Sequence, residues 1–104
     1  MQGSPRGKAP RINYDAAVAY RYTPEVLEEL AGHGLAPAPQ TPPGLLRDAL
    51  RDLYKYEIKV LKARLLAGAF PRPEYADRVI QLRRRYPLLS VPVQMWLVPD
   101  REGR

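Results

Sequence analysis

The chain has 104 residues, with 17 Lys and Arg against 11 Asp and Glu, which gives a net charge of +6. A chain of this length forms one small domain, and the absence of cysteine excludes disulfides, iron–sulfur clusters and zinc sites built on thiolates. No apolar run reaches the roughly 18 residues that a membrane-spanning helix needs, so we expect no membrane partner.

The N-terminal residues 1–11 are polar and are interrupted by glycine and proline, which predicts a flexible basic arm carrying Arg6 and Arg11. The arm lacks the apolar core of a secretory signal peptide, so we expect a cytoplasmic protein. In residues 12–22, large apolar or aromatic side chains alternate with smaller or polar ones. This period of two favours a half-buried strand, although the alanine-rich centre leaves a helix as the alternative.

A short helix is expected next, because Thr23 can cap it and Pro24 suits its first position. Gly32 and Gly34 would end it. Residues 35–43 contain four prolines and predict a stiff, extended connector rather than a ligand for another domain.

The clearest element is a long helix over residues 44–67, which has no internal proline or glycine and is followed by Gly68. Its apolar side chains fill an arc wider than the usual stripe. Such a helix is covered from more than one direction, so it is either the central element of the fold or part of an oligomer interface. A third helix over residues 73–86 has one apolar face and would pack antiparallel to the long helix.

The apolar stretch of residues 88–98 contains proline and predicts an extended tail. The tail and residues 12–22 could pair into a two-stranded ribbon, or each could pack separately on the helices. We therefore expect a mainly α fold with extended segments at both ends. Residues 12–99 would form the single domain, between the arm and a polar tail of residues 100–104.

Two charged residues, Glu57 and Arg64, fall within the apolar arc of the long helix, two turns apart. Charged groups on a buried face must be paired or functional. The structural interpretation is a buried ion pair, either with each other or with an arginine of the third helix. The functional interpretation is a small pocket for a polar or anionic substrate.

Arginines gather toward the end of the third helix, where Arg78 precedes the run Arg83, Arg84 and Arg85. Guanidinium groups suit phosphate binding, and Arg6 and Arg11 of the arm could extend such a surface. Cations are also favoured at a helix C-terminus without any ligand. The sequence leaves both interpretations open.

Large apolar side chains that could contact a partner are Trp96 and Met95 in the tail and Tyr54 and Tyr56 in the long helix. The tail would otherwise be an exposed apolar patch, so it must dock on its own chain or on a partner.

No catalytic, metal-binding or cofactor-binding motif occurs, so we assign no catalytic residue, metal or cofactor. The preferred hypothesis is a non-enzymatic interaction module, an accessory or assembly subunit that binds a protein partner or a second copy of itself. The alternative is a small basic protein that binds RNA or nonspecific DNA through the arginine cluster and the arm. A small helical enzyme using Glu57 and Arg64 is the third hypothesis. The excess of arginine over lysine and the many prolines also suit a thermophile.

Overall fold

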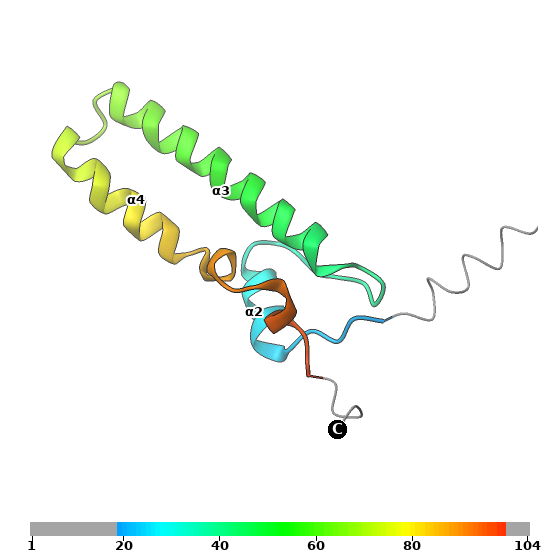
Figure 1. Ribbon diagram of the computed structural model, residues 1–104. Coiled ribbons are helices and arrows are strands. Elements are labelled where there is room, and N and C mark those ends of the chain that lie inside the picture. The colour runs from blue at the N-terminus through cyan, green and yellow to red at the C-terminus, as the bar shows by residue number, and fades with distance from the viewer. Residues whose placement is uncertain (1–18, 100–104) are drawn as a thin grey trace, which may run out of the picture.

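A computed structural model describes residues 19–99 of the chain (Figure 1). The expected basic arm, most of the expected N-terminal strand and the polar tail lie outside the described residues. The described part is mainly helical and contains no β-strand, which confirms the predicted mainly α class. Its α-helices are α2 (Pro24–Gly32), α3 (Pro43–Leu66) and α4 (Tyr75–Arg84). Between residues 19 and 99, no helix combines the length and the apolar character that crossing a membrane requires.

The short helix α2 begins and ends where its sequence predicts. The Thr23 hydroxyl oxygen accepts a hydrogen bond of 3.2 Å from the backbone N–H of Val26, and Pro24 occupies the first turn. At the other end, Gly34 has a φ of 79°, and the N–H of Leu35 donates to the Leu30 carbonyl. These two caps account for the boundaries of the helix.

Helices α3 and α4 form an antiparallel hairpin (Figure 1). The 24 residues of α3 span about 36 Å and begin at Pro43, one position before the expected start. The hairpin turn passes through Gly68 and a short 3-10 turn, Arg72–Glu74, which leads into α4. Helix α2 and the C-terminal tail gather at the other end of the hairpin, beside the first half of α3 (Figure 1).

The hydrophobic core lies at this crowded end. Its central side chain is Trp96, which is 0% exposed and donates its indole N–H to the Val91 carbonyl at 3.1 Å. The remaining buried members are Tyr22, Val26, Leu30, Leu46, Leu50, Leu82, Tyr86 and Leu88. The fully buried α3 side chains all belong to its first half, and the second half adds the partly buried Ile58 and Leu61.

The tail differs from the extended segment that was expected. It forms two 3-10 turns, Pro87–Ser90 and Val93–Trp96, because a proline precedes or opens each turn and removes a backbone donor that a strand would use. A single antiparallel bridge joins Tyr22 to Leu97. This bridge is the only part of the expected ribbon that the described residues contain.

The proline-rich connector is tied to the rest of the fold. The Tyr22 hydroxyl donates to the Thr41 carbonyl at 2.6 Å, and the Tyr20 N–H donates to the Pro39 carbonyl at 2.8 Å. A turn at residues 39–40 interrupts the extended path that was expected. The connector therefore holds the start of α3 close to the entry into α2.

Replacing Gly68 with alanine is expected to lower the free energy of unfolding by about 1–2 kcal/mol. Gly68 has a φ of 79°, and a Cβ there would meet no atom within 4 Å, so the cost is backbone strain alone. Gly44→Ala is the matched control, because Gly44 also has open space but lies inside α3, where alanine is the better helix former. Urea denaturation of both variants checks the prediction, and equal effects at the two positions would contradict it.

Candidate functional site

The second half of α3 and the facing side of α4 enclose a surface groove of about 620 Å³. We call it the α3–α4 groove. Its apolar lining consists of Leu53, Tyr56, Val60, Leu61 and Leu82, and its polar lining of Glu57, Arg64, Arg78, Gln81 and Arg85. All of these lining residues belong to α3, to α4 or to the residue that follows α4, and none comes from α2 or the tail.

Exposed apolar side chains of α3 form one wall of this groove. Leu53, Tyr56 and Val60 follow each other at spacings of three and four residues, and Tyr56 is 65% exposed. Helical residues at these spacings share one face. The wide apolar arc of α3 is thus covered only in part: Ile58 and Leu61 pack partly against the core, whereas Leu53, Tyr56 and Val60 remain exposed.

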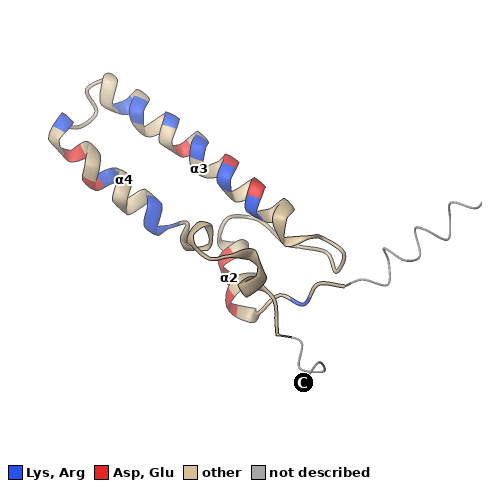
Figure 2. Cartoon of the chain, in the orientation of Figure 1, with Lys and Arg blue, Asp and Glu red and all other residues tan. Residues whose placement is uncertain are grey.

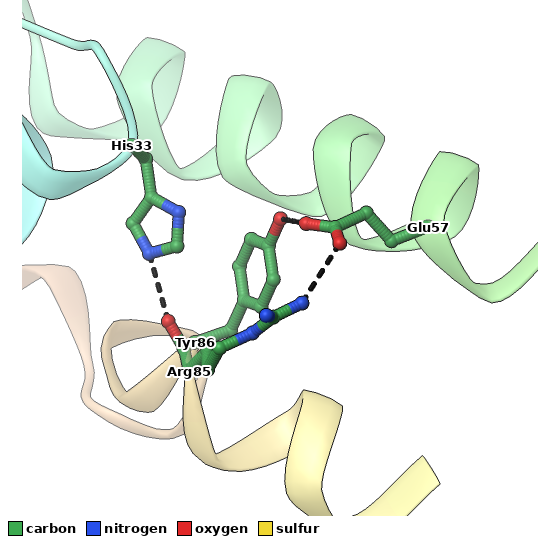
Figure 3. Close-up of polar contacts among 4 residues, drawn as sticks. All are labelled: His33, Glu57, Arg85 and Tyr86. Atoms are coloured by element: carbon green, nitrogen blue, oxygen red, sulfur yellow. Dashed lines mark hydrogen bonds and ion pairs between the residues drawn. The ribbon is translucent and has the colours of Figure 1, made fainter. Parts of the chain in front are cut away.

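Glu57 joins α3 to the end of α4 (Figure 3). Its Oε1 lies 2.9 Å from Arg85 Nη2, and its Oε2 accepts a hydrogen bond from the Tyr86 hydroxyl. Both carboxylate oxygens therefore have a donor within the chain. This arrangement fixes the two helices against each other and leaves Glu57 poorly placed to act as a general base.

The expected buried pair of Glu57 and Arg64 is corrected by the structure. Glu57 is partly exposed and binds Arg85, which follows α4, so the interpretation of a structural pair with an arginine of the third helix describes it better. Arg64 lies two turns further along α3 and is exposed. Within residues 19–99 it forms no ion pair.

His33 is a member of this cluster that the sequence did not indicate. Its Nε2 donates to the backbone carbonyl of Arg85 at 2.8 Å, and its ring stacks on Tyr86 with 4.4 Å between centroids (Figure 3). Tyr54 contacts the same tyrosine edge-on at 5.4 Å. Because 52 residues separate His33 from Arg85, no local pattern could have linked them.

The pKa of Tyr86 is raised to about 12, first by burial and then by the hydrogen bond and negative charge of Glu57, whereas the Arg85 charge lowers it. Burial, together with Tyr20, also raises the pKa of Tyr22. The folded state thus holds both phenols in their neutral form more strongly than the unfolded chain does.

Alkaline solution is therefore expected to destabilise the protein between about pH 10 and pH 12. Tyr86 has a folded pKa of about 12 against an ordinary value of 10.0, so its contribution is complete below pH 10 and is lost as the pH rises through 12. The loss at this residue is about 2–3 kcal/mol. Denaturation curves across this range check it: Tyr86→Phe should remove much of the pH dependence, and Tyr56→Phe, at an exposed site, should leave it intact.

Basic positions gather toward the C-terminal end of α4 (Figure 2), and most arginines of this cluster make contacts within the chain. Arg78 pairs with Glu74 at 3.1 Å, and its guanidinium lies 4.2 Å from the centre of the Phe70 ring. Arg85 pairs with Glu57, and the Arg83 guanidinium lies 5.8 Å from the centre of the Tyr54 ring. Arg84 lines a shallow hollow that also contains Glu28 and Glu29. Arg6 and Arg11 lie outside the described residues.

The four apolar side chains expected at a partner interface differ in their exposure. Trp96 is 0% exposed, so it belongs to the chain's own core and is not available to a partner. Tyr54 is half-buried against Tyr86. Tyr56 and Met95 are 65% and 66% exposed. Of the four, only Tyr56 lines the α3–α4 groove.

Among the side chains of residues 19–99, no group of three acidic or histidine residues is placed to hold a metal ion. Comparison of the chain with protein-family models, with curated proteins and with solved structures finds no match. The candidate site is therefore defined by its own geometry: an apolar groove with charged residues along its sides.

Proposed function

We propose that the protein is a non-enzymatic interaction module, an accessory or assembly subunit, whose docking surface is the α3–α4 groove. The observation that carries the proposal is the uncovered apolar face of α3, formed by Leu53, Tyr56 and Val60. An apolar face of this kind is favoured in a folded protein when another surface covers it.

The shape of the hairpin supports the same function. At the crowded end, α2 and the tail provide the additional layer that covers α3 and α4. Further along, only the two helices face each other, and a third helix laid into the groove would complete a small bundle. Each apolar side chain fully removed from water there would contribute about 1.5–3 kcal/mol of transfer free energy.

A photo-crosslinking amino acid placed at position 56 in living cells tests this function. Tyr56 points a 65% exposed side chain at the groove, whereas Leu45, which is 60% exposed, lies on the same helix outside it. We expect a discrete adduct with a second protein from position 56 and none from position 45. When Val60→Asp is added to the chain that carries the photo-crosslinking amino acid at position 56, the adduct should disappear.

The captured protein would then be purified and its binding to the chain measured directly, with Val60→Asp as the groove variant and Leu45→Asp as the control. Binding that only the groove variant weakens supports docking in the groove. Equal adducts from positions 45 and 56, or binding that is insensitive to Val60, would show that the groove is not the docking surface.

The alternative function, binding of RNA or nonspecific DNA, has one favourable observation. Lys55, Lys59 and Lys62 are exposed and share one side of α3 at spacings of four and three residues, and no carboxylate pairs with them in the described part of the chain. Fluorescence anisotropy with labelled RNA and duplex DNA at low and moderate salt tests it. Tight binding that weakens steeply with salt, and that Lys59→Glu reduces, would favour this function over protein docking.

A further inference from the structure

The α3–α4 groove combines an apolar lining with an excess of positively charged residues. Its charged lining residues are Arg64, Arg78, Arg85 and Glu57, which is three guanidinium groups against one carboxylate. The carboxylate is already paired with Arg85. The groove therefore presents an excess of positive charge to whatever enters it.

One of these arginines, Arg64, keeps exposed donors that no carboxylate of the described residues uses. Arg78 differs, because its Nη2 pairs with Glu74 and its Nε, which has no hydrogen-bond partner in the described residues, is buried beyond the reach of an incoming segment; Arg78 therefore contributes charge to the groove lining. Guanidinium groups bind carboxylates with good geometry, so carboxylates on an incoming segment would be matched here.

The form of the groove favours a helix as its occupant. An extended peptide that binds by strand addition needs a sheet edge to pair its backbone, and residues 19–99 contain no strand to offer one. A helix satisfies its own backbone and needs only an apolar stripe. The groove runs along α3 from Leu53 to Arg64, about 17 Å, which matches about three turns of a docked helix.

We propose, building on the docking role proposed above, that the α3–α4 groove binds an acidic amphipathic helix of another protein. The apolar stripe of that helix would cover Leu53, Tyr56 and Val60, and carboxylates beside the stripe would face Arg64 and Arg78. A second copy of this chain fits less well, because it would bring the same three arginines against each other and the chain carries a charge of +6.

Two synthetic peptides of about 18 residues test the proposal. Both carry leucines at spacings of three and four residues, with glutamates beside the stripe in one peptide and lysines in the other. Binding to the full chain is measured by fluorescence anisotropy. We expect the glutamate peptide to bind about tenfold more tightly than the lysine peptide, because several groove charges act together.

Variants of the full chain locate the interaction. Arg64→Glu should weaken binding of the glutamate peptide and strengthen binding of the lysine peptide. Lys59→Glu makes the same charge change on α3 outside the groove and should change neither affinity. Val60→Asp should abolish binding of both peptides. Tyr56→Ser, at a more exposed position, provides a second groove variant if Val60→Asp fails to fold.

The outcomes separate this inference from the proposed function. Equal binding of both peptides, lost in Val60→Asp, would overturn the preference for an acidic helix and leave the docking surface in place. Binding of neither peptide, or binding insensitive to both groove variants, would overturn both proposals. If sedimentation shows a dimer that Val60→Asp dissociates, the occupant of the groove is a second copy of the chain. If RNA displaces the glutamate peptide, the occupant is nucleic acid. Either result would overturn the inference.

Discussion

Replacing Trp96 with alanine is expected to lower the free energy of unfolding by about 3–5 kcal/mol, enough to unfold much of the population of a small domain. Trp96 is 0% exposed and is the largest side chain in the core. It packs where α2, the first half of α3 and the tail meet, so its loss leaves a cavity between several elements. The hydrogen bond from its indole N–H to the Val91 carbonyl is lost as well.

The neighbouring residue supplies the control for this experiment. Met95 is 66% exposed, so Met95→Ala should change the free energy of unfolding by no more than about 0.5 kcal/mol. Urea titrations followed by far-ultraviolet circular dichroism would compare the two variants with the natural chain. If both variants lost the same stability, the tail would not be docked in the way the structure shows.

The second large effect is expected at Leu50, which is 1% exposed in the first half of α3. Leu50→Ala should lower the free energy of unfolding by about 2.7–5 kcal/mol, because the substitution loses the transfer free energy of the buried side chain and leaves a cavity. Leu45→Ala is the same substitution on the same helix at a site that is 60% exposed, and it should cost less than about 1 kcal/mol. Thermal and urea denaturation of the pair check the difference, and a similar loss at both sites would place the core elsewhere.

Much of the fold was predictable because its boundaries are set locally. The Thr23 cap and the left-handed Gly34 delimit α2, and Gly68 turns the chain after α3. The width of the apolar arc predicted that α3 is covered from more than one direction, whereas in the structure Leu50 is buried and Tyr56 and Val60 are exposed. The sequence could not show which part of the arc would be covered, because that depends on where α2 and the tail dock.

The candidate site was less predictable because its contacts join distant parts of the chain. Glu57 was singled out for lying in an apolar arc, but its partners Arg85 and Tyr86 lie 28 and 29 residues away. Nothing in the sequence favoured Arg85 over Arg64. His33 lies between two glycines, and its neighbours in sequence say nothing of its contact with Tyr86.

The sequence left open whether Trp96 contacts a partner or belongs to the core. A tryptophan in an apolar tail is typical of interface anchors and of cores alike. In this chain the prolines of the tail fold it into two tight turns, and these turns place Trp96 inside the core. The exposed apolar surface is found on α3 instead.

The central claim is that the α3–α4 groove is a docking surface, and hydrogen exchange followed by mass spectrometry tests it most directly. The full chain would be measured alone and with the glutamate-flanked peptide. We predict slower exchange in residues 53–64 and 78–85, which contain the groove lining, and no change in residues 24–32 and 88–96. Slower exchange confined to α2 and the tail, or no change anywhere at saturating peptide, would contradict the claim.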